Sequence, residues 1–173
     1  KITSLFTGYI YRNSFKNWSI SINSPLTTIS YNTVQGRNTT TSINYFKSLN
    51  KTGKWIQAGA NLNYSMSEKK IRPVLYFTKK WNSILRPKMF ISVGKKISQF
   101  NERNPISKFY NTIYSLFLKE NYLKIYEKSF SKISYSQEVL NGLYISGFLE
   151  YASRKPLFNT SNFVVFGRAI PFQ

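Results

Sequence analysis

The chain has 173 residues and a formal net charge of +19 at pH 7, because 25 residues are Lys or Arg and only six are acidic. It contains neither Cys nor His, which excludes disulfides, thiol chemistry and imidazole bases and removes the usual zinc ligands. The length is typical of one domain, and the charge favours anionic partners: nucleic acid, a phosphate-rich membrane surface or an acidic protein. An AT-rich genome would also enrich Lys, Asn, Ile, Tyr and Phe together, but it would not explain the shortage of acids.

Short alternating segments begin the chain and predict β-strands. Residues 18–23 alternate apolar and polar side chains and end before Pro25, which cannot donate to a strand ladder. Residues 28–35 and 40–47 show the same alternation, and each run is followed by a turn that contains a glycine. We therefore expect three strands in the first 50 residues.

The clearest alternation lies in GKWIQAGANLNYSMS, residues 53–67. Its odd positions from Gln57 to Ser67 are small or polar, so this strand has two different faces. A strand of about 9 to 11 residues can cross a bilayer when tilted, and barrel strands alternate lipid-facing with lumen-facing side chains. The apolar positions are therefore candidates for lipid contact: Ile56, Ala58, Ala60, Leu62, Tyr64 and Met66.

The rest of the chain continues the β pattern. Strands are expected at residues 71–79, 88–96, 109–118, 131–137, 143–151 and 163–166. Asn141-Gly142 is the strongest two-residue hairpin signal, whereas residues 119–130 fit a short helix or a turn. About ten β segments without a long helix predict an all-β, antiparallel, up-and-down fold. No run of 18 apolar residues exists, so a helical membrane span is not expected.

No constellation of residues indicates catalysis. All six acids are Glu, and their spacing places none reliably beside another, so a paired-carboxylate mechanism is not indicated. The glycines form no phosphate-binding loop. We therefore predict a non-enzymatic protein without catalytic residues, cofactor or metal, in which the carboxylates pair with neighbouring Lys side chains at turns and on the surface.

Lysine doublets fall near the ends of predicted strands, where a barrel would meet phosphate headgroups. The headgroup-contact candidates are Lys79, Lys80, Lys95 and Lys96. Simple solvation at loop mouths is the alternative explanation for the doublets. The many Tyr and Trp residues would form interfacial girdles in a membrane barrel, stack bases on a nucleic-acid-binding sheet, or fill a sandwich core.

Several long strings resemble one known family: FTGYIYRNSFKNWSISINSPLTTISYNTVQG, SEKKIRPVLYFTKKWNS, SQFNERNPISKFYNTIYSLF, KENYLKIYEKSF and YASRKPLFNTSN. They are similar to the barrel portion of a poorly characterised outer-membrane family of Bacteroidota, whose members carry a carboxypeptidase-regulatory-like domain ahead of a β-barrel. The resemblance reaches to about Asn162, and residues 163–173 do not match the expected pattern. It implies no catalytic residue, because the family has no established reaction.

Together these observations predict a transmembrane β-barrel, whole or partial, with about ten strands. We expect residues 1–173 to form one barrel domain within a larger chain in the bacterial outer membrane. Its partners would be outer-membrane lipid, lipopolysaccharide phosphates and other envelope proteins, within an outer-membrane transport or protein-assembly complex. The alternative is a soluble, basic, all-β subunit of a ribonucleoprotein that binds nucleic acid.

Overall fold

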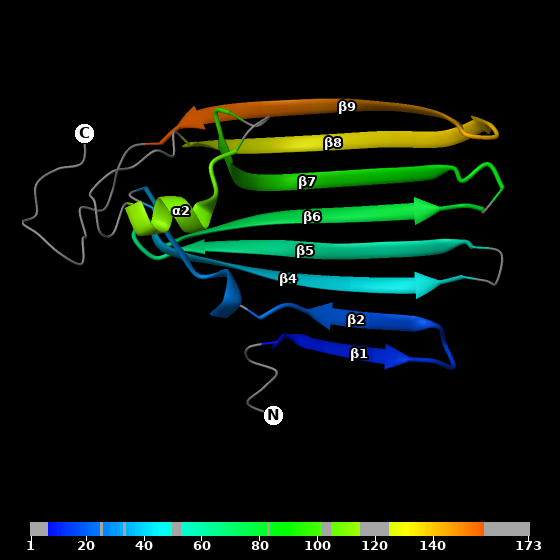
Figure 1. Cartoon of the computed structure of the whole chain (residues 1–173), viewed down its shortest axis with the longest axis horizontal. Helices are drawn as coiled ribbons and strands as arrows, with labels where there is room; N and C mark the ends of the chain where they lie inside the picture. The colour runs from blue at the N-terminus through cyan, green and yellow to red at the C-terminus, as the bar shows by residue number, and fades with distance from the viewer. Residues whose placement is uncertain are drawn as a thin grey trace, which may run out of the picture.

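The computed structural model describes residues 7–24, 26–32, 34–49, 53–82, 84–101, 105–114 and 125–157. Within these ranges the protein is all-β, and nine strands form one antiparallel sheet (Figure 1). The sheet is open, with β1 and β9 at opposite edges. The strands are β1 (Tyr9–Asn13), β2 (Trp18–Ile22), β3 (Ser30–Asn32), β4 (Gly36–Ser48), β5 (Trp55–Ser65), β6 (Lys70–Lys80), β7 (Lys88–Gln99), β8 (Ile125–Leu140) and β9 (Leu143–Pro156).

The strands follow one another across the sheet as they do along the chain. The order is β1-β2-β4-β5-β6-β7-β8-β9, and the short β3 pairs with the beginning of β4. The strands from β4 to β9 are long, between 11 and 16 residues. The predicted all-β, antiparallel, up-and-down arrangement is therefore confirmed within the described residues.

The two ends of the sheet are built differently. At one end, called the hairpin end, short turns join β1 to β2, β4 to β5, β6 to β7 and β8 to β9. The last of these turns is Asn141-Gly142, as predicted, and Gly142 adopts a φ of 83° that suits glycine. At the opposite end, called the capped end, a short turn joins β5 to β6, whereas longer stretches of sequence, residues 23–35 and 100–124, separate β2 from β4 and β7 from β8.

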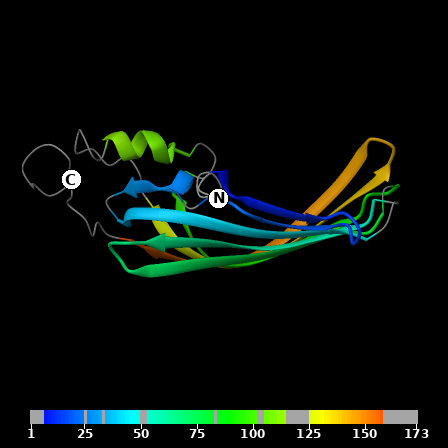
Figure 2. The same ribbon diagram turned by 90° about the horizontal axis from the view of Figure 1, so that it is seen from below.

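Among the described residues, two short helices belong to these longer connections. They are η1, a 3-10 helix at Leu26–Thr28, and α2 at Lys108–Ile113. Figure 2 shows η1, β3 and α2 on one side of the curved sheet, near the capped end. The Thr112 hydroxyl holds α2 against β3, because it lies 3.1 Å from both the backbone nitrogen and the backbone oxygen of Tyr31.

The sequence prediction was wrong at several elements. A strand was predicted at residues 109–118, but residues 108–113 form α2, because a short alternating run also fits a helix and tertiary hydrogen bonds through Thr112 favour that helix. Residues 125–130 belong to β8 and not to a helix or turn. The strand β1 was not predicted, and among the described residues of the expected strand at 28–35 only Ser30–Asn32 form a strand. The predicted strand at 163–166 lies outside the described residues.

Little of the described chain is a dry core. The buried apolar side chains are Tyr31, Val34, Ile125 and Tyr126, and Ile97 and Leu157 pack against Val34 and Ile125. This small cluster lies at the capped end, where the long connections meet β7 and β8. Within the described ranges, no helix is both long enough and apolar enough to cross a membrane.

Candidate functional site

One face of the sheet carries apolar side chains across eight consecutive strands. Strand register connects these residues as direct neighbours, one from each strand, so they form a continuous row. The row consists of Tyr11, Ile20, Tyr45, Ala58, Phe77, Ile91, Ile133 and Leu149. The adjacent row on the same face begins with Tyr9, Ile22, Ile43, Ala60, Leu75 and Val93. We call this surface the apolar face.

The apolar face is exposed. Leu75 is 53% exposed, Val93 48% and Leu149 76%, although all three are large and hydrophobic. The predicted lipid-facing residues from Ile56 to Tyr64 lie on this face of β5, whereas Met66 lies in the turn that follows. Lipid contact stays a prediction for all six residues, but the structure places five of them within the continuous apolar surface.

Aromatic and basic side chains border the apolar face toward the hairpin end. The Trp18 ring lies 5.4 Å from that of Tyr11 and 6.1 Å from that of Tyr45, measured between centroids. The Lys79 ammonium lies 5.1 Å from the centre of the Trp81 ring. The Trp, Tyr and Lys side chains in these contacts each combine an apolar body with a polar tip. Such side chains are typical of the boundary between an apolar surface and water.

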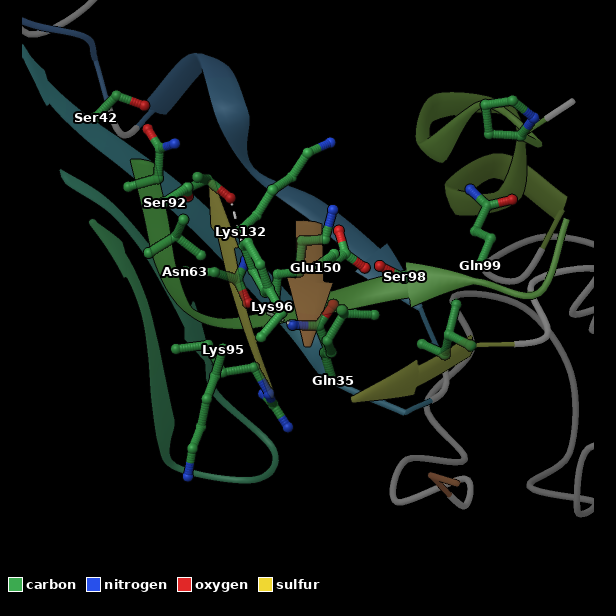
Figure 3. A pocket seen from close by; sticks show the side chains of 18 of the residues that line it. Gln35, Ser42, Asn63, Ser92, Lys95, Lys96, Ser98, Gln99, Lys132 and Glu150 are labelled. Carbon is green, nitrogen blue, oxygen red and sulfur yellow. Dashed lines mark hydrogen bonds between the residues drawn. The ribbon is translucent and has the colours of Figure 1, made fainter. Parts of the chain in front are cut away.

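The opposite face is polar and concave near the capped end, and we call it the polar face. Its central strands contribute small hydroxyl and amide side chains, because the alternating positions of β4, β5 and β7 point to this side. A pocket of about 840 Å³ lies here, between the sheet and residues of both long connections (Figure 3). Its polar lining includes Asn32, Gln35, Ser42, Asn61, Asn63, Arg72, Ser92, Lys95, Lys96, Lys132 and Glu150.

Arg72 is the most deeply buried charged group at the pocket, since only 1% of its side chain is exposed. Its Nε donates to Glu127 Oε2 at 2.7 Å, and its Nη2 donates to Glu68 Oε1 at 2.7 Å. The third nitrogen, Nη1, is buried without a hydrogen-bond partner. Two carboxylates therefore share one guanidinium, while one of its edges is left with donors that nothing in the described structure satisfies.

The turn between β5 and β6 supplies one of these carboxylates. Burial by itself raises the pKa of Glu68, but the hydrogen bond and charge of Arg72 outweigh it, assisted by Ser65 and Lys70, so that the pKa is lowered overall. Ser65 Oγ lies 3.0 Å from both Glu68 Oε2 and the backbone oxygen of Gln35. The ionised carboxylate thus links the β5–β6 turn to β6 and to the loop before β4.

Amide side chains extend this network across the polar face. Gln35 Nε2 donates to Asn63 Oδ1 at 2.7 Å, and Asn63 Nδ2 donates to Thr40 Oγ1 at 3.1 Å. Asn32 Nδ2 donates to Gln35 Oε1 at 3.0 Å, while its own Oδ1 accepts the backbone N–H groups of Val34 and Gln35. Such a satisfied network fixes the loop before β4 over the pocket.

A glycine opens the sheet beside Arg72. The pairing of β6 with β7 ends at Val74 and Gly94, although β7 continues to Gln99 in register with β8. Gly94 adopts a φ of 152°, and a Cβ there would lie 2.2 Å from the Pro73 carbonyl oxygen. Beyond this point no backbone ladder joins the two strands, and the Arg72–Glu127 pair connects β6 directly to β8.

Basic side chains gather on the β7–β8–β9 side of the pocket. Lys96 lies opposite Lys128 across β7 and β8, and Lys132 lies opposite Glu150 across β8 and β9. Lys128 Nζ is 2.6 Å from Glu150 Oε1, so this carboxylate is paired with Lys128. Figure 3 shows Lys96, Lys132 and Glu150 next to one another in the pocket.

The four lysines predicted to meet headgroups occupy different surfaces. Lys79 lies on the apolar face near the hairpin end, and Lys80 points to the polar face. Lys95 and Lys96 line the pocket. Headgroup contact stays a prediction for all four. Sequence reasoning did not single out Arg72, Glu68 and Glu127, and the one available signal was an Arg within a run, residues 71–77, whose other members are apolar or aromatic.

The geometry defines a class of protein: an open, antiparallel, all-β meander with an exposed apolar face and a polar face that bears a basic pocket. Within the described ranges, no three acidic residues are grouped in a way that could hold a metal ion. Residues 3–172 match the family described as "Family of unknown function (DUF5686) C-terminal domain". The chain therefore belongs to this uncharacterised family. No curated protein and no solved structure matches this chain.

Proposed function

We propose that this chain is a segment of a transmembrane β-barrel in a bacterial outer membrane, where it acts as a non-enzymatic envelope component. The observation that carries the proposal is the apolar face, which spans eight strands and is exposed to solvent in the isolated chain. A soluble sheet normally covers such a face with a second layer. Here η1, β3 and α2 lie on the polar side, near the pocket.

The dimensions of the strands support this placement. From Ile56 to Tyr64 the apolar positions of β5 cover roughly 26 Å, at about 3.3 Å per residue. Outer-membrane barrels present an apolar band of about 25 Å toward lipid, flanked by aromatic girdles. Trp18, Tyr45 and Trp81 would belong to the girdle at the hairpin end. In a closed barrel the edges at β1 and β9 would pair with further strands or with each other. This closure would satisfy the backbone groups that an open edge exposes.

In this proposal the polar face lines the lumen, and the hairpin end faces the periplasm, because bacterial barrels carry their shorter turns there. Lys79 would contact phospholipid headgroups of the periplasmic leaflet, whereas Lys80 would point toward the lumen. The resemblance to Bacteroidota proteins with a carboxypeptidase-regulatory-like domain supports the compartment. It also supports a subunit role in an outer-membrane transport or protein-assembly complex, with other envelope proteins as partners. A soluble nucleic-acid-binding role has less support, because it leaves the apolar face uncovered.

Tryptophan quenching tests the proposal, because Trp18 and Trp55 lie on opposite faces of the sheet. Two single-Trp variants, with Phe at the other two Trp positions, would be refolded into vesicles of brominated phosphatidylcholine. We expect strong quenching of Trp18 and at least about threefold weaker quenching of Trp55, since bromine atoms in the acyl chains reach only the lipid-facing side.

Equal quenching of the two residues would contradict the assignment of faces. A chain that remains monomeric in detergent-free buffer, and binds RNA with a steep salt dependence, would overturn the membrane proposal in favour of the nucleic-acid alternative.

A further inference from the structure

We propose that the pocket on the polar face is a binding site for a phosphate-bearing ligand, held by Lys96, Lys132 and the free edge of Arg72. The pocket is large enough for a small phosphorylated solute or for a lipid headgroup, at about 840 Å³. The inference does not depend on the membrane placement, because the pocket lies on the face opposite the apolar rows.

The charge balance of the pocket favours an anion. Glu68 and Glu127 are both engaged by Arg72, and Glu150 is engaged by Lys128 at 2.6 Å. Among the described residues no carboxylate lies within ion-pair distance of Lys96 or Lys132, although both charges act on Glu150. Lys95 also lines the pocket, so the lining residues and their ion-pair partners comprise five cations and three carboxylates, an excess of two positive charges: Arg72, Lys95, Lys96, Lys128 and Lys132 against Glu68, Glu127 and Glu150.

The strand register concentrates this charge. Lys96 and Lys128 are direct cross-strand partners, and both ammonium groups lie over the Phe130 ring, at 5.3 and 5.9 Å from its centre. Like charges at directly opposed positions destabilise a sheet. The single carboxylate of Glu150 balances only one of them, so a bound anion would relieve the remaining repulsion.

Arg72 supplies the second, independent observation. Its side chain is 1% exposed and lines the pocket, yet Nη1 has no partner. A buried donor without a partner is costly, and the cost disappears when a ligand oxygen accepts its hydrogen bond. Nη1 itself has less than 1 Å² of accessible surface, so its hydrogen bond to a ligand oxygen requires a small shift of the Arg72 side chain toward the pocket.

The donors suit a phosphate better than a carboxylate. Carboxylates are recognised best by the planar fork of an arginine, but Nε and Nη2 of Arg72 are already taken by Glu127 and Glu68. What remains is one guanidinium nitrogen and two flexible ammonium groups. Lysines bind phosphate as point charges that need no fixed plane, and a doubly charged group balances the two lysines.

The test is a calorimetric titration of the whole chain, in a non-ionic detergent at low salt, with inorganic phosphate. We expect saturable binding at one site, weakened at least about tenfold in Lys96→Ala/Lys132→Ala. The matched control is Lys80→Ala/Lys88→Ala, which removes the same charge from a cross-strand pair on the polar face outside the pocket lining. The control should bind phosphate within about twofold of the original chain.

Two further titrations test the chemical class of the ligand and its source. Acetate at the same concentrations should compete at least about tenfold less well than phosphate. Displacement of phosphate by phosphatidylglycerol added to the micelles would assign the site to a lipid headgroup, and absence of displacement would assign it to a soluble phosphorylated ligand. Absence of saturable phosphate binding, or equal weakening in the two double variants, would overturn the proposal.

Discussion

At the residue scale, the buried charges at the capped end form one interdependent unit. Arg72 holds two carboxylates that come from different parts of the sheet, and its own burial is nearly complete. A buried ion pair contributes little net free energy compared with apolar residues of similar size, but removal of one partner leaves the other charge buried and uncompensated. The arginine therefore determines whether Glu68 and Glu127 can remain ionised inside the structure.

We predict that Arg72→Met lowers the free energy of unfolding by about 3 to 5 kcal/mol, because Glu68 and Glu127 would lose their shared cation. The matched control is Lys70→Met, which removes an exposed ammonium 4.0 Å from the same Glu68 carboxylate. It should cost about 0 to 1 kcal/mol, as exposed ion pairs do. Denaturant unfolding in one detergent, followed by circular dichroism, measures both values. Similar costs for the two variants would show that burial of Arg72 does not matter.

At the element scale, Gly94 determines where β6 and β7 separate. The strands are paired from Lys80 and Lys88 as far as Val74 and Gly94, and β7 then continues with β8 alone. Because β7 separates from β6 here, Arg72 faces the pocket instead of pairing with β7, so a single backbone position contributes to the shape of the site.

We predict that Gly94→Ala destabilises the protein by about 1 to 3 kcal/mol, the range for a residue held in an unfavourable backbone conformation. Its Cβ would also meet the Pro73 carbonyl oxygen at 2.2 Å. Gly147→Ala on β9 is the control, since a Cβ there meets nothing within 4 Å. The same unfolding measurement applies, and a Gly94→Ala variant as stable as the control would show that the separation does not require glycine.

The elements also show how far local pattern carries a prediction. Alternation located β5, β6 and β7 closely, and Asn141-Gly142 located the β8–β9 turn, because both signals depend on neighbouring residues alone. Alternation failed for α2, because the Thr112 hydroxyl of this helix donates a hydrogen bond to the backbone oxygen of Tyr31, 81 residues earlier. It also missed β1, which is ordered by pairing along β2 rather than by a strong pattern of its own.

At the scale of the whole molecule, the two faces of the sheet would meet different environments. Ala60 and Asn61 are adjacent at the middle of β5, but Ala60 belongs to the apolar face and Asn61 lines the pocket. In the proposed barrel the first would meet hydrocarbon and the second would meet an aqueous lumen. The pair therefore compares two environments within one strand.

We predict that Ala60→Arg costs about 2 to 4 kcal/mol of stability in lipid vesicles, as an arginine does near the bilayer midplane. Asn61→Arg should cost much less, because its charge would remain in water. Reversible unfolding of both variants from the same vesicles compares them directly. Equal costs would contradict the assignment of lipid-facing and lumen-facing sides.

The sequence alone determined the fold class and the two-sided strands, because side chains alternate with a period of two wherever a chain is extended. It did not locate the pocket. Arg72, Lys96 and Lys132 are separated by up to 60 positions, and only the strand register and the separation of β6 from β7 place them around one cavity. Nor could alternation show that the apolar sides of eight strands join into one exposed surface. That depends on how each strand aligns with its neighbours, which is a property of the tertiary structure.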